Sequence, residues 1–83
     1  MKNVKFKVLE ESLKNQKYYA LIKISVGVRA GYCVAVEDDE LSLQGIGSNE
    51  ARAKEIYDLF LDQEVSAIHV DEIVRDLQNA IFY

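Results

Sequence analysis

The amino-acid sequence predicts an α+β fold, a three- or four-stranded antiparallel meander followed by a helical hairpin packed on one face of the sheet. Residues 48–81 repeat apolar side chains at positions i, i+3, i+4 and i+7 in two successive segments, as amphipathic helices do. Residues 3–46 alternate apolar and polar side chains, as strands do. The links between these strands are short, which favours antiparallel hairpins over crossover connections.

The chain has 83 residues, enough for one domain and too few for two. Its 49% hydrophobic and 29% charged residues are typical of a soluble globular protein. No apolar run approaches the roughly 20 residues of a membrane span, and the N-terminus lacks the apolar block of a signal peptide. Cys33 is the single cysteine, so no internal disulfide indicates an oxidising compartment. We therefore expect one cytoplasmic domain over residues 1–83, without a membrane segment.

Three strands are expected, at residues 3–10, 17–28 and 31–37, and residues 41–46 could form a fourth. Residues 11–17 are expected to form a hairpin loop or one helical turn, and residues 29–31 a turn. Gly27 is expected to mark a bulge or a close backbone approach. The second strand is apolar on both faces, which suits a central strand: one face carries Tyr18, Ala20, Ile22, Ile24, Val26 and Val28, and the other carries Tyr19, Leu21, Lys23 and Ser25.

Two helices are expected, at residues 49–63 and 67–81, with Ser48 and Ser66 as N-caps. The short link between them predicts antiparallel neighbours. Phe82 and Tyr83 extend the apolar stripe of the second helix and are expected to fold back on the sheet. The predicted core consists of Val4, Phe6, Val8, Ile22, Ile24, Val34, Val36, Ile56, Phe60, Ile73, Val74 and Leu77.

The charge is unevenly distributed along the chain. Residues 1–29 contain seven basic residues against two acidic ones, and residues 30–83 contain three against twelve. Halves of opposite charge could attract a second copy of the chain. We therefore expect a non-enzymatic interaction or regulatory module whose partner is a second copy (a homodimer) or another protein. The expected interface is the outer sheet face with Lys5, Lys7, Tyr19, Leu21 and Lys23.

Two alternative functions remain. The same lysines and Tyr19 could form the face of an RNA- or nucleotide-contacting module, although the net charge of −4 disfavours nucleic acid. Cys33 could serve a small thiol enzyme, with His69 as the single available imidazole. A structural thiol in a strand is the simpler interpretation.

No catalytic, cofactor-binding or metal-binding residue is predicted among the remaining polar side chains. His69 and Glu72 are three residues apart on one helix face, but Asp71 points elsewhere and no second histidine exists. The acidic turn at residues 37–40 lacks the spacing of a calcium loop. Gly45 and Gly47 precede a helix but lack the βαβ context of a nucleotide site.

The order of features resembles a family of short, uncharacterised bacterial proteins, a domain of unknown function of Firmicutes type. The resemblance rests on the strand Tyr32–Glu37, the helix Glu50–Leu61 and the closing segment Val65–Leu77. It covers about residues 18–77. It implies the domain boundaries and no activity, ligand or catalytic residue.

Overall fold

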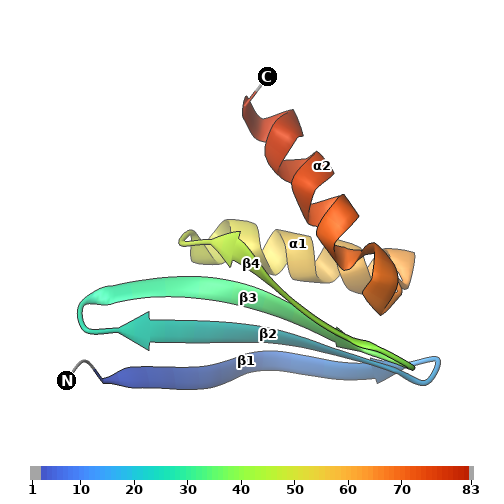
Figure 1. Cartoon of the computed structure of the whole chain (residues 1–83), viewed down its shortest axis with the longest axis horizontal. Helices are drawn as coiled ribbons and strands as arrows, with labels where there is room; N and C mark the ends of the chain where they lie inside the picture. Colours follow the sequence, from blue (N-terminus) through green and yellow to red (C-terminus); the bar gives the residue numbers. More distant parts are fainter. Residues whose placement is uncertain (1–2, 83) are drawn as a thin grey trace.

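The computed structural model describes residues 3–82 and the side chains of residues 3–77. Four antiparallel strands form one sheet in the order β1-β2-β3-β4, and two helices pack on it (Figure 1). The predicted meander followed by two helices is confirmed. The elements are β1 Val4–Lys14, β2 Lys17–Val26, β3 Arg29–Glu37, β4 Leu41–Gly47, α1 Glu50–Gln63, the 3-10 helix η1 Ala67–His69 and α2 Val70–Phe82.

The first hairpin is tighter than predicted, because β1 continues to Lys14 where a loop or helical turn is expected. Only Asn15 and Gln16 connect β1 to β2, and their φ angles are 51° and 66°. Two successive residues with positive φ are the signature of a type I′ turn, whose twist matches that of the flanking strands. A bulge between Val8 and Glu10 shifts the register of β1 along β2.

The second hairpin also turns within two residues, Gly27 and Val28. Gly27 has a φ of 62°, which glycine adopts at no steric cost, and Val26 pairs with Arg29 directly across the turn. Gly27 is therefore a turn residue, not the bulge or close backbone approach that the sequence predicts, and the predicted turn at residues 29–31 is wrong. Residues 29–31 already belong to β3.

Helix α1 begins and ends through local hydrogen bonds. Asn49, rather than Ser48, caps α1: its side chain accepts a hydrogen bond from the Arg52 N–H at 3.0 Å. Glu64 ends α1 in the left-handed conformation, and the Val65 N–H reaches the Phe60 carbonyl at 3.1 Å. The left-handed Glu64 and the hydrogen bond from Val65 to Phe60 are the features of a Schellman motif.

The two helices are further from antiparallel than a simple helical hairpin implies. The axis of α2 is steeply inclined to that of α1, and its C-terminal end points away from the sheet (Figure 1). The side chains of Phe82 and Tyr83, which the sequence predicts to fold back on the sheet, lie outside those that the structure describes. Within residues 3–82, neither helix combines the length and the apolar content that crossing a membrane requires.

The core lies between the sheet and the helices. It confirms the predicted burial of Val34, Val36, Ile56, Phe60 and Val74, while Ile73 and Leu77 are partly buried at its margin. The other buried apolar side chains of this cluster are Tyr19, Leu21, Tyr32, Ile46, Ala53, Tyr57, Val65, Ala67 and Val70.

The predicted core placement of five residues is wrong: Val4, Phe6, Val8, Ile22 and Ile24 lie on the opposite face of the sheet. Val34 pairs with Leu21 in the sheet, and directly paired residues share a face. The helices that cover Val34 therefore also cover Leu21, and its neighbours along the strand point the other way.

Candidate interaction surface

The sheet face that points away from the helices, here named the open face, is lined mainly by apolar side chains. Its residues follow from strand alternation and register, since directly paired residues share a face. Its apolar members are Val4, Phe6, Val8, Leu13, Tyr18, Ala20, Ile22, Ile24, Val26, Cys33, Ala35, Leu41 and Leu43.

The apolar side chains of the open face are continuous across the strands. Phe6 pairs with Ile24, Val8 with Ile22, and Ala35 with Leu43. Phe6 is 71% exposed, and Val4, Val8, Leu13, Leu41 and Leu43 are each at least half exposed. The free face of an antiparallel sheet is usually polar, so an apolar one of this extent is typical of a binding surface.

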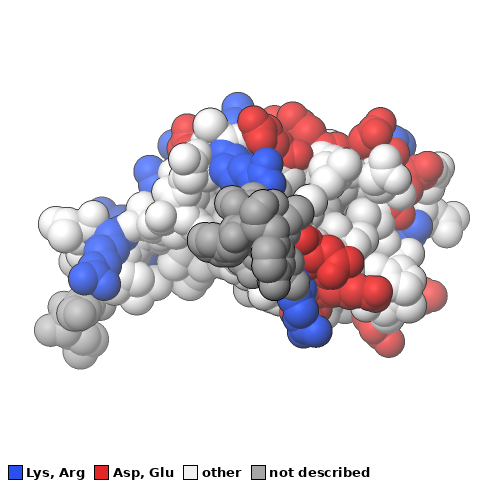
Figure 2. All heavy atoms as spheres, turned by 90° about the horizontal axis from the view of Figure 1, so that it is seen from above, with Lys and Arg blue, Asp and Glu red and all other residues white. Residues whose placement is uncertain are grey.

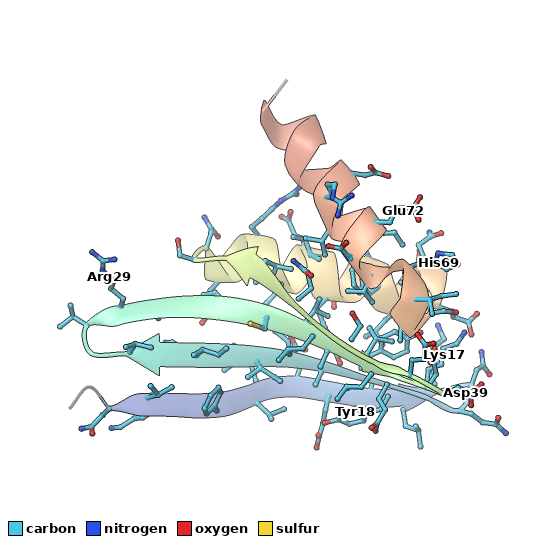
Figure 3. The ribbon with its side chains drawn as sticks, viewed as in Figure 1. Lys17, Tyr18, Arg29, Asp39, His69 and Glu72 are labelled. Atoms are coloured by element: carbon cyan, nitrogen blue, oxygen red, sulfur yellow. The ribbon has the colours of Figure 1, made fainter. Side chains whose placement is uncertain are left out.

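Charged side chains occur on the open face only near its two ends. Arg29 pairs with Val26 at the end formed by the β2–β3 hairpin. Glu37 pairs with Tyr18 at the opposite end, where the Tyr18 hydroxyl donates to the carboxylate of Glu11. This hydrogen bond, together with burial, raises the pKa of Tyr18. Figure 3 shows Arg29 at one end of the sheet and Tyr18 at the other.

The interface predicted from the sequence is placed on the wrong face. Tyr19 and Leu21 are fully buried beneath the helices, and the Tyr19 hydroxyl donates to the Val65 carbonyl at 2.9 Å. Burial raises the pKa of Tyr19. These two residues are therefore part of the core and not of an accessible surface.

Lys5, Lys7 and Lys23 point to the same side of the sheet as Tyr19 and Leu21. Lys7 pairs with Lys23, which in turn pairs with the buried Tyr32. The three lysines lie toward the β2–β3 hairpin, where the strands extend beyond α1 (Figure 1). Figure 2 shows Lys and Arg at this end, on the left, and mainly Asp and Glu toward the right. The RNA-contacting alternative loses Tyr19 as a stacking residue.

Cys33 lies in the middle of the open face, opposite Ile22, and is half-buried. Burial raises the pKa of its thiol, which favours the unreactive protonated form at neutral pH. His69 is placed in η1, where its Nδ1 lies 3.8 Å from Glu72 Oε2 (Figure 3). Asp71 instead pairs with Arg75 at 2.8 Å. The thiol and the imidazole thus have separate surroundings.

The acidic turn at residues 37–40 has a structural role at Asp38. One carboxylate oxygen accepts the Glu40 N–H at 2.9 Å, and the other accepts the Ala67 N–H at 3.0 Å. These hydrogen bonds hold the pKa of Asp38 below its usual value. The turn is thereby fixed to the start of η1. Among the residues that the structure describes, no three His, Cys, Asp or Glu side chains group as metal ligands would.

The residues that sequence reasoning missed are the apolar side chains of β1 and β2 that the helices leave uncovered. A signal was available, because β2 is apolar on both faces whereas the helices can cover only one. No family model, curated protein or solved structure in the comparisons matches this chain. The resemblance to a family of short bacterial proteins therefore stays a prediction.

Proposed function

We propose that this chain is a non-enzymatic protein-interaction module that self-associates through its open face. The supporting observation is the continuous apolar surface around Phe6, Val8, Ile22 and Ile24. Burying apolar surface releases about 25 cal/mol per Å2, so a face of this kind favours an apolar partner over water.

A second copy is a partner of the required chemistry. The open face is apolar at its centre and carries no charge there, so it is complementary to itself. Packing two such faces would make a sandwich with a second core between the sheets, as in other sheet-on-sheet folds. A two-fold axis would bury the same residues on both copies.

The test is the molar mass of the purified chain over a range of concentrations, by light scattering after size exclusion. We expect a dimer for the wild type and a monomer for Phe6→Asp, because the variant places a charge where the apolar faces would meet. The matched control is Ile68→Asp, since Ile68 is similarly exposed (64%) but lies in η1, outside the open face. The control should remain a dimer.

The same samples can locate the interface through Cys33, the single cysteine of the chain. Alkylation of Cys33 should slow as the wild-type concentration rises and should stay constant for Phe6→Asp. A wild type that is monomeric at every concentration would contradict self-association. A dimer that Phe6→Asp leaves intact would place the interface elsewhere.

A further inference from the structure

The residues of the open face form rows across the strands. One end row contains Val4, Val26 and Arg29, and the opposite end row contains Leu13, Tyr18, Glu37 and Leu41. The middle row contains Val8, Ile22 and Cys33. Because the middle row divides the face evenly, a two-fold axis along it would superimpose one end row on the other.

The two ends of the open face differ in charge. Arg29 is the basic residue of one end, and Glu11 and Glu37 are the acidic residues of the other. Arg29, Glu11 and Glu37 are all exposed. The open face is thus apolar in the middle with a positive and a negative end.

Two face-to-face arrangements keep a two-fold axis and a large overlap. With the axis along the strands, both Arg29 side chains meet at one end, and all the glutamates meet at the other. With the axis across the strands, the ends are exchanged, and Arg29 of each copy faces Glu37 of the other. Only the second arrangement brings opposite charges together.

Side-chain size is compatible with the second arrangement at the centre of β2. An axis along the middle row places Ile24 of one copy over Ala20 of the other, since both belong to β2 and flank Ile22 on either side. A large side chain then faces a small one, as interdigitating sheets require.

The area of the open face is adequate for a dimer. Four strands about 4.8 Å apart, of about nine residues at about 3.3 Å each, give a footprint of roughly 570 Å2 per copy. Two copies bury about 1,100 Å2 by this flat measure, close to the lower limit of about 1,200 Å2 for stable complexes. Protruding side chains such as Phe6 add accessible area to the footprint.

From these observations we infer that two copies pack open face to open face with their strands in opposite directions, pairing Arg29 of each copy with Glu37 of the other. The inference rests on the proposed function and adds the orientation of the partner. It assigns Arg29 and Glu37 as the residues that select this orientation.

The test is a charge-reversal cycle on the wild-type chain: Arg29→Glu, Glu37→Arg and the double variant, with dimer dissociation constants measured at low salt by analytical ultracentrifugation. Each single reversal replaces two attractive contacts per dimer by repulsive ones, so we expect each to weaken the dimer at least about tenfold. The double variant restores opposite charges in every contact and should return to within about threefold of the wild type. Added salt should shrink these differences.

The control reversal is Lys54→Glu, which lies on α1 away from the open face and should leave the dimer unchanged. The opposed orientation would be overturned if no reversal changes the affinity of the dimer. It would also be overturned if the double variant is weakened by the two single effects combined. Either result would leave self-association itself intact. A wild type that stays monomeric at all concentrations would overturn the proposed function together with this inference.

Discussion

Tyr19 joins the sheet to the segment between the two helices through one buried hydroxyl. Its ring is fully buried under α1, and its O–H donates to the carbonyl of Val65, two residues after the last residue of α1. A hydroxyl in this position satisfies a carbonyl that has left the helical hydrogen-bond pattern. Tyr19 therefore stabilises both the core and the path of the chain into η1.

Tyr19→Phe keeps the ring and removes that hydrogen bond. We expect the free energy of unfolding to fall by about 1–3 kcal/mol, because a buried carbonyl loses its donor. Urea denaturation at a fixed protein concentration measures the change. The control is Tyr18→Phe, whose hydroxyl bonds Glu11 on the open face and should matter less. Equal losses of unfolding free energy for the two variants would contradict a larger contribution from the buried Tyr19 hydrogen bond.

The ionisation of Asp38 should make the stability of the fold depend on pH. Its pKa is lowered in the folded chain by the N–H groups of Glu40 and Ala67, so folding favours the ionised form. A lowered folded pKa gives stability that is present above the unfolded value of 3.8 and is lost as the pH falls through the folded pKa. The hydrogen bonds to η1 weaken as the carboxylate is protonated.

The measurement compares melting temperatures of the wild type and Asp38→Ala between pH 3 and pH 7. The variant should melt lower at neutral pH, and the difference should shrink below about pH 4. Asp39→Ala, which changes the neighbouring carboxylate, is the control and should show little difference at any pH. A difference for Asp38→Ala that does not vary with pH would contradict the role of the ionised carboxylate.

At the scale of the elements, the second hairpin turn decides which residues of β2 share a face with the buried residues of β3. Gly27 and Val28 close the second hairpin so that Val26 meets Arg29. Even-numbered residues of β2 then lie opposite odd-numbered residues of β3. A turn at residues 29–31 would instead allow Ile22 and Ile24 to share a face with Val34 and Val36. A shift of one residue exchanges the two faces of a strand.

The first turn contains a residue that glycine would fit better. Gln16 has a φ of 66°. This conformation is strained for a residue with a Cβ atom, whereas glycine adopts it freely. We expect Gln16→Gly to raise the free energy of unfolding by about 0.5–1 kcal/mol, after the greater entropy of glycine in the unfolded chain is counted. Urea denaturation checks this. Gln16→Ala retains the Cβ atom and should bring no such gain; a similar gain from alanine would contradict the turn strain.

At the scale of the whole molecule, the fold is a two-layer structure with a core on one side of its sheet. Helix α1 packs on β2 and β3 and α2 packs on β4, so the helical layer buries Tyr19, Leu21, Val34 and Val36, while Phe6 and its neighbours stay exposed. A domain of 83 residues buries a modest share of its unfolded surface, so leaving a second apolar face in water is costly. Self-association would remove that cost, which is why the oligomeric state is the property to measure first.

Part of this architecture could be predicted from local patterns. The helical repeat that includes Ile56 and Phe60 identifies the buried stripe of α1, because a helix in a small domain has one apolar stripe to bury. Strand alternation likewise puts Val34 and Val36 on one side of β3. The candidate site could not be predicted in the same way. In β2, the apolar residues Leu21 and Ile22 point to opposite faces, and either face could have met the helices.

The sequence by itself determined the strand meander, the two helices and the face that each helix buries, because those features depend on periodicities within a few residues. Only the tertiary structure decided which sheet face the helices cover. That choice depends on the exact turn positions, on the bulge in β1, and on the partner that the Tyr19 hydroxyl finds at Val65. The turns and the bulge each set a register over a whole strand, so an error of one residue exchanges the core with the open face.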